Sequence, residues 1–143
     1  MGLPDPVAGL VIRYAFLWRD QARRGVDEGS KDRPCAILLS VSDDAGNRRV
    51  TVLPVTHSPP RNPALAVEIP AATKRRLGLD DQPSWIVLTD ANRFIWPGPD
   101  LRPRPGGDLS SVAIGLLPRG LYNEVREKFI AAVRGRATGI VGR

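Results

Sequence analysis

Two apolar runs decide the fold: Pro34-Cys35-Ala36-Ile37-Leu38-Leu39-Ser40-Val41 and Arg49-Val50-Thr51-Val52-Leu53-Pro54-Val55-Thr56. Each has the length of a β-strand and is rich in branched apolar residues. The segment between them, Asp43-Asp44-Ala45-Gly46-Asn47, has the composition of a turn. The runs therefore predict a β-hairpin, and the unbroken apolar character of the first run predicts a strand that is buried on both faces.

The segments around this hairpin alternate between short strands and polar loops. Upstream, Leu10 to Trp18 is apolar and aromatic, which predicts a strand. Arg19 to Arg33 mixes charges with glycines and predicts a mobile surface loop. Downstream, three prolines between His57 and Pro63 predict a second loop, which leads into a short strand at Leu65 to Ile69.

The C-terminal half adds two helices. Pro70 and Gly78 bound a short helix over Ala71 to Leu77. Strands are expected at Trp85 to Thr89, Arg93 to Trp96 and Ser111 to Leu116, with a bend at Asp90-Ala91-Asn92 and a loop from Pro97 to Gly107. The last helix follows Pro118 and ends at Gly135, and its apolar residues recur at helical spacing: Leu121, Val125, Phe129 and Ala132 or Val133.

These elements predict one mainly β domain of the α+β class. We expect a small β-barrel of six or seven strands, with a short helix and a C-terminal helix packed on it. A length of 143 residues fits a single domain. Residues 1–8 are expected to form an N-terminal extension, residues 9–134 the domain and residues 135–143 a flexible tail.

The charge of the chain is carried by arginine. Lys and Arg number 21 against 15 Asp and Glu, a net charge of +6, and 18 of the 21 are Arg by direct count. Guanidinium groups favour an anionic partner such as nucleic acid, although a GC-rich coding sequence would also enrich Arg, Pro and Gly. The single cysteine, Cys35, excludes a disulfide framework and predicts a buried apolar role. With no secretory signal and no membrane-length apolar run, we expect a cytoplasmic protein with no membrane partner.

Polar side chains gather at two strand ends that could carry chemistry. Arg33, in Lys31-Asp32-Arg33-Pro34, stands where the charged segment meets the buried strand, so it is either a rigidly held cation or a surface arginine paired with Asp32. Thr56-His57-Ser58 follows the second strand of the hairpin and holds the single histidine of the chain. That histidine is either a proton carrier or an ordinary polar loop residue, and no cysteine or second histidine is present nearby to complete a metal site.

Three other features have structural explanations. Thr89-Asp90-Ala91-Asn92-Arg93 fits ordinary turn chemistry. Lys74-Arg75-Arg76 fits the solvated face of a short helix, with phosphate contact as the alternative. Packing is favoured over base stacking for the three tryptophans: Trp18, Trp85 and Trp96.

The order of these pieces resembles one known family. Gly9 precedes an apolar strand, Gly25 and Glu28 lie in the charged segment, and Arg33-Pro34 precedes the next strand. The pattern continues through Val52-Leu53-Pro54-Val55-Thr56, Ala66-Val67-Glu68-Ile69, Trp85-Ile86-Val87-Leu88-Thr89-Asp90 and the C-terminal helix. In this order the chain resembles the MazF/PemK/Kid family of toxin endoribonucleases, over roughly Gly9 to Val133.

The resemblance implies an SH3-like barrel that dimerises with a second copy, is held by a cognate antitoxin and cuts single-stranded RNA without metal or other cofactor. Attack of the 2′-hydroxyl on the adjacent phosphate would make the cut. By position, Arg33, Thr56 and Asp90 match the catalytic residues, with Arg33 as phosphate cation and candidate acid, and with Asp90 or His57 moving the proton. The expected RNA-binding residues are Lys31, His57, Ser58, Arg61 and Arg93.

Two departures from the family pattern favour an alternative function. Leu10 and Leu88 stand where members of the family often have an acidic residue and a second arginine. The alternative function is a non-catalytic module of the same fold that binds nucleic acid, or binds a protein target as CcdB toxins do.

Overall fold

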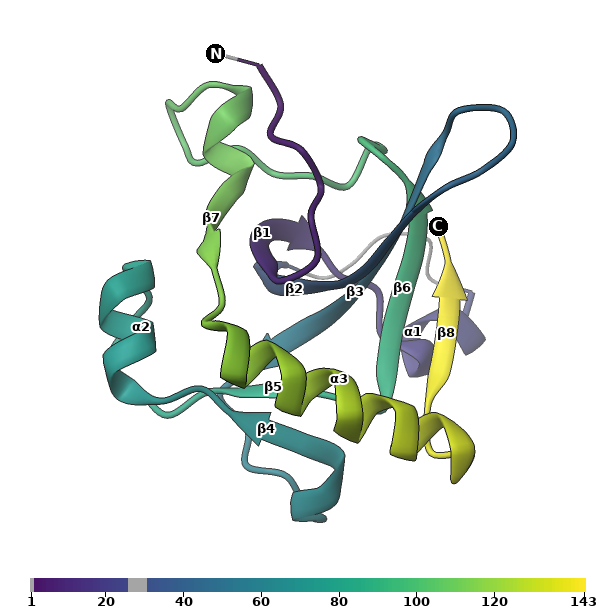
Figure 1. Ribbon diagram of the computed structural model, residues 1–143, viewed down its shortest axis with the longest axis vertical. Coiled ribbons are helices and arrows are strands. Elements are labelled where there is room, and N and C mark those ends of the chain that lie inside the picture. The colour runs from purple at the N-terminus through teal and green to yellow at the C-terminus, as the bar shows by residue number, and fades with distance from the viewer. Residues whose placement is uncertain (1, 26–30) are drawn as a thin grey trace.

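The structure is a computed structural model that describes residues 2–25 and 31–143. Glu28, part of the family pattern, lies outside the described residues. Within them the protein is mainly β, with one eight-stranded sheet and three α-helices, as the α+β class predicts (Figure 1).

The predicted hairpin is confirmed and forms the centre of the sheet. Strand β2 (Asp32–Ser42) pairs antiparallel with β3 (Arg48–Thr56), from Cys35 opposite Pro54 to Ser42 opposite Arg48. Asp43 closes the turn, because its Oδ1 accepts the backbone N–H groups of Ala45 at 3.0 Å and Asn47 at 2.9 Å.

The remaining strands extend both edges of this hairpin. On the β2 side lie β1 (Leu10–Ala15) and then β7 (Ala113–Leu116). The outer edge of β3 is shared by β5 (Trp85–Val87) and β6 (Asp90–Ile95), and β5 also pairs with β4 (Ala66–Glu68). The end strands β4 and β7 are not paired with each other, so the sheet is not closed into a barrel, and it has one strand more than the six or seven predicted.

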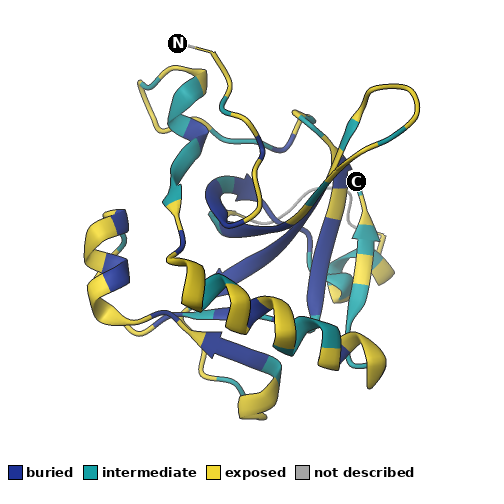
Figure 2. Cartoon of the chain, viewed as in Figure 1, coloured by how far each residue is buried: buried dark blue, intermediate teal, exposed yellow. Residues whose placement is uncertain are grey.

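The sheet is buried on both faces near its centre, as Figure 2 shows. Alternate residues of β2 enter two cores: Ala36 and Leu38 pack into one with helix α3, and Cys35 and Ile37 pack into the other. The second core is aromatic, with the rings of Tyr14 and Phe94 stacked at 4.8 Å between centroids. The doubly buried strand predicted from the first apolar run is therefore confirmed for Cys35 to Leu38.

The two predicted helices are also confirmed. Helix α2 (Ala71–Leu77) ends at Gly78, whose φ of 72° is the left-handed conformation that glycine adopts most readily. Helix α3 (Arg119–Arg134) lies across the sheet in Figure 1 and buries Val125 and Ala132 against it.

The segment expected to be a mobile loop begins with a helix instead. Helix α1 (Arg19–Arg23) follows Trp18, and Asp90 accepts the backbone N–H of Arg19 at 2.9 Å. This bond satisfies one of the amide groups that a helix leaves free at its start. The prediction failed because the partner is 71 residues away in the sequence.

The bend predicted at Asp90-Ala91-Asn92 is wrong as well, because these residues begin β6. The chain bends two residues earlier, at Leu88 and Thr89, where β3 exchanges one partner strand for the next. Asp90 and Asn92 have side chains typical of turns, but here both are buried; Asn92 bonds to Leu17, just before α1, and Asp90 to Arg19, its first residue.

The expected flexible tail instead forms strand β8 (Gly139–Gly142), which pairs parallel with β6 (Figure 1). The free edge of β6 supplies the backbone partners, and Arg143 anchors the end through an ion pair of 3.0 Å between its Nη2 and Asp100 Oδ1. No helix among the described residues is long and apolar enough to cross a membrane.

Candidate nucleic-acid site

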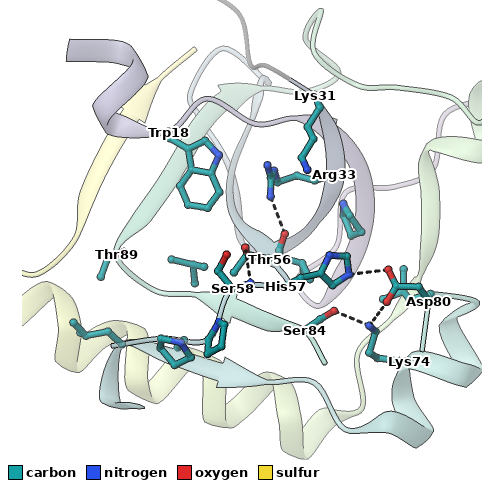
Figure 3. Close-up of a pocket in the computed structure, with 18 of the residues that line it drawn as sticks. Trp18, Lys31, Arg33, Thr56, His57, Ser58, Lys74, Asp80, Ser84 and Thr89 are labelled. Atoms are coloured by element: carbon teal, nitrogen blue, oxygen red, sulfur yellow. Dashed lines mark hydrogen bonds and ion pairs between the residues drawn. The ribbon is translucent and has the colours of Figure 1, made fainter. Parts of the chain in front are cut away.

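A pocket of about 780 Å³ opens where β2 begins and β3 ends. Its walls come from the first residues of β2, the end of β3, the loop at residues 57–62 and the segment after α2 (Figure 3). The pocket brings together six of the residues predicted for the site: Lys31, Arg33, Thr56, His57, Ser58 and Arg61. This volume suffices for a nucleotide-sized ligand, since ligand pockets span roughly 300–1,000 Å³.

Arg33 is held from two sides. Its Nη1 donates to the backbone oxygen of Val55 at 3.2 Å, and its guanidinium carbon lies 5.0 Å from the centroid of the Trp18 ring. Its Nε is buried and has no hydrogen-bond partner among the described residues. Asp32, the expected surface partner, instead pairs with Arg102 at 3.5 Å. The guanidinium is therefore fixed in place, and its Nη groups, rather than the buried Nε, are the donors that a ligand in the pocket can reach.

Thr56 is the last residue of β3 and lines the same pocket as Arg33 (Figure 3). Its Oγ1 accepts the backbone N–H of Ser58 at 3.2 Å, which turns the chain into the loop. A hydroxyl that accepts one hydrogen bond still has its own proton to donate. Thr56 can therefore donate to an anionic oxygen placed against Arg33.

The segment that carries Trp18 is clamped by two side chains of β6. Asn92 accepts from the backbone N–H of Leu17 at 2.9 Å and donates to its oxygen at 2.7 Å. Asp90 Oδ2 accepts the N–H of Arg19, and Thr89 Oγ1 donates to Asp90 Oδ1 at 3.1 Å. Trp18 stands between these two clamps, so β6 fixes the ring on which Arg33 rests.

The opposite wall of the pocket holds a chain of three ionisable groups (Figure 3). His57 Nε2 lies 2.7 Å from Asp80 Oδ2, and Lys74 Nζ lies 2.6 Å from Asp80 Oδ1. Lys74 is only 4% exposed and also donates to the oxygen of Gln82 and to Ser84 Oγ. We call this set, Lys74, Asp80 and His57, the ionisable chain.

Two ionisable groups of the pocket have shifted pKa values. The hydrogen bond from Lys74 is the largest of several that lower the pKa of Asp80 to about 2, so its carboxylate is ionised at neutral pH. Burial lowers the pKa of Arg33, because removing water disfavours the charged guanidinium.

Two predicted residues lie away from the pocket. Asp90 does not line it and is occupied by its bonds to Arg19 and Thr89. Arg93 is exposed on β6, opposite Thr51 of β3. The structure thus separates Asp90 and Arg93 from Arg33 and Thr56.

The lining also includes side chains that were not predicted for the site, among them Trp18, Lys74, Asp80 and Ser84. The sequence does contain a signal that Lys74 is buried. Lys74 and Leu77 are three residues apart, so they share the buried face of helix α2. Nothing in the sequence alone pairs Asp80 with His57, since that contact depends on how α2 packs.

Within residues 2–25 and 31–143, no group of three or more His, Cys, Asp or Glu side chains could hold a metal ion. No protein-family model matches the chain, and no curated protein matches it. The likeness to MazF/PemK/Kid toxins therefore rests on the residues described above and is carried forward as a proposal.

Proposed function

We propose that the pocket binds single-stranded RNA and cleaves it, without metal, by attack of a 2′-hydroxyl on the adjacent phosphate. One observation carries the proposal: Trp18 and Val55 fix Arg33 in the wall of the pocket that Thr56 also lines. A preorganised cation with unused donors suits a phosphate that gains negative charge in the transition state.

The cleavage needs three contributions from the protein. The O2′–P bond forms while the P–O5′ bond breaks, which gives a 2′,3′-cyclic phosphate and a free 5′-hydroxyl. Arg33 stabilises the charge on the phosphorus oxygens, and Thr56 donates a hydrogen bond that orients them. Arg33 is also the candidate acid for the leaving 5′-oxygen, because burial lowers its pKa, and solvent then restores the proton.

A base must also take the proton of the attacking hydroxyl. Of the two residues considered from the sequence, His57 lines the pocket, whereas Asp90 bonds to Arg19 and Thr89. We therefore assign proton acceptance to His57. Lys31, Ser58 and Arg61 are placed to contact the flanking phosphates and sugars.

The test is cleavage of a long single-stranded RNA by the purified protein in EDTA. We expect fragments that end in 2′,3′-cyclic phosphate. Replacing Arg33 by alanine should slow cleavage by about 10²–10³, the usual loss when one donor to a developing oxyanion is removed. The matched control is Arg126→Ala, since Arg126 is exposed on α3 and does not line the pocket.

Two results would contradict the proposal. Cleavage that disappears in EDTA and returns with a divalent cation would show metal-dependent chemistry. Equal rates for Arg33→Ala and Arg126→Ala would remove Arg33 from the reaction.

A second candidate function is a nucleic-acid-binding module without catalysis. The observation that favours it concerns the two departures from the family pattern. Leu10 and Leu88 are packed in the core, at 6% and 0% exposed, and neither supplies a charged group to the pocket. RNA that binds across many sequences and is never cut would select this function.

The proposal also includes an antitoxin partner, a second copy of the chain and an SH3-like fold, all of which the resemblance implies. The cations of the pocket suit an acidic antitoxin segment. Val41, Arg49 and Ile95 lie in one row across β2, β3 and β6, with Val41 and Ile95 49% and 43% exposed. Such exposed apolar side chains suit contact with a second copy. The β1–β2–β3 order of neighbouring strands supports an SH3-like barrel in open form.

A further inference from the structure

Asp80 is unusually well fixed for a half-exposed carboxylate. Its Oδ1 accepts from Lys74 Nζ at 2.6 Å and from the backbone N–H of Gln82 at 3.1 Å. Lys74 is itself held by Ser84 Oγ and by the oxygen of Gln82. Surface ion pairs are normally loose because two long side chains must be ordered, but here one partner is buried and the other is bound to the backbone. The second oxygen, Oδ2, is left facing His57.

This arrangement determines which nitrogen of His57 carries the proton. An ionised carboxylate only accepts hydrogen bonds. Nε2 lies 2.7 Å from Asp80 Oδ2, so Nε2 must donate. In the neutral ring the other nitrogen, Nδ1, is then the acceptor.

We propose that Asp80, anchored by Lys74, is a positioning residue that holds His57 with Nε2 protonated and Nδ1 free to accept the proton of the attacking 2′-hydroxyl. The catalytic part of this inference rests on the proposed function, whereas the orientation of the ring does not. A carboxylate behind an imidazole sets both its tautomer and its direction.

Two protons move during the cleavage step, one to His57 and one from Arg33. The 2′-hydroxyl proton moves to His57 Nδ1 as the O2′–P bond forms. The P–O5′ bond breaks, and the 5′-oxygen takes its proton from Arg33. The imidazolium then rests beside the Asp80 carboxylate until it loses its proton to solvent, and solvent reprotonates Arg33.

The orientation can be measured directly because the chain contains a single histidine. Its two ring ¹⁵N resonances in the free protein report which nitrogen is protonated. We expect protonated Nε2 in the wild type at a pH where the ring is neutral. In Asp80→Asn the amide oxygen should keep Lys74 and the Gln82 N–H, so the NH₂ group would face Nε2 and shift the ring towards protonated Nδ1.

Two controls accompany this measurement. Asp81→Asn removes the same charge from the neighbouring exposed residue and should leave the ring resonances unchanged. Lys74→Met removes the anchor of Asp80 and should weaken the preference for protonated Nε2, whereas Arg75→Met, on the exposed side of α2, should leave the ring resonances unchanged. If Lys74→Met does not fold, Asp80→Asn decides alone. Ring resonances in Asp80→Asn that equal those of the wild type would overturn the orientation.

Cleavage rates test the catalytic part of the inference, in which Asp80 positions His57 to accept the proton. Asp80→Asn should slow cleavage by about 10–100-fold, the usual loss for a partner that orients a reacting group. In a His57→Ala background the same change should have no further effect, because Asp80 acts through His57. An equal loss in both backgrounds would overturn the positioning role. A wild-type protein that cuts no RNA would overturn the proposed function and the catalytic part of this inference, and the ring resonances would still decide the orientation.

Discussion

At the scale of single residues, Asp90 shows how a side chain at a site-like position can serve the fold. It is 8% exposed and accepts from the backbone of Arg19, the first residue of α1, and from Thr89 Oγ1. Asp90→Ala should therefore lower the free energy of unfolding by about 1–2 kcal/mol, because the first turn of α1 loses an acceptor. Chemical denaturation measures this loss, with Asp44→Ala in the exposed turn as the control.

The cleavage rate separates this role from a catalytic one. Below the unfolding transition, Asp90→Ala should slow cleavage far less than the 10²–10³ expected for Arg33→Ala. A loss as large as that for Arg33, with unchanged stability, would return Asp90 to the reaction.

The residues that the sequence revealed are those whose roles depend on near neighbours. Arg33 and Thr56 were found because each stands at the end of an apolar run, and the hairpin register brings those ends together. Asp80 was missed because it meets His57, 23 residues away in the sequence, only through the packing of α2, and the role of Lys74 depends on its bond to Asp80. Single-sequence patterns contain no information about such packing.

At the scale of elements, β8 is anchored at its end by the side chain of Arg143, whose buried ion pair with Asp100 is the main contact. The Arg143 and Asp100 side chains are 5% and 12% exposed, and Arg143 Nη1 also donates to the oxygen of Ala15 at 2.9 Å. Arg143→Ala should lower the free energy of unfolding by about 3 kcal/mol, because it leaves the Asp100 carboxylate buried without its ion-pair partner. Thermal or chemical denaturation measures the change, with exposed Arg134→Ala as the control. A change below about 0.5 kcal/mol would mean that the strand is held by its backbone bonds to β6 alone.

As with the residues, the elements that could be predicted are those with local sequence signals. The hairpin and helices α2 and α3 were predicted because their signals are local: a turn composition, a glycine after the last helical turn and an apolar repeat. Helix α1 and strand β8 were missed because each is completed by β6 from far along the chain. The turn-like residues of β6 misled the prediction, since their side chains bond to distant backbone groups rather than to their own.

At the scale of the whole molecule, net charge is a poor guide to where an anion binds. The chain carries +6, but six basic and two acidic residues lie between Arg119 and Arg143, by count. That region is helix α3 and strand β8, away from the pocket lining. The pocket itself holds few cations, of which Lys74 is bonded to Asp80.

The salt dependence of RNA binding shows whether the phosphates contact the pocket cations or the basic C-terminal region. If binding uses the three other pocket cations, Lys31, Arg33 and Arg61, the slope of log affinity against log salt should be about −2, since each phosphate contact on a single strand contributes roughly −0.7. Binding through the whole basic surface would give a much steeper slope. Fluorescence anisotropy with a labelled single-stranded RNA measures this, and Arg61→Ala should make the slope shallower by about 0.7 while Arg126→Ala leaves it unchanged. A slope near zero would mean that the pocket does not bind nucleic acid, because released counterions are the unavoidable consequence of neutralising phosphates.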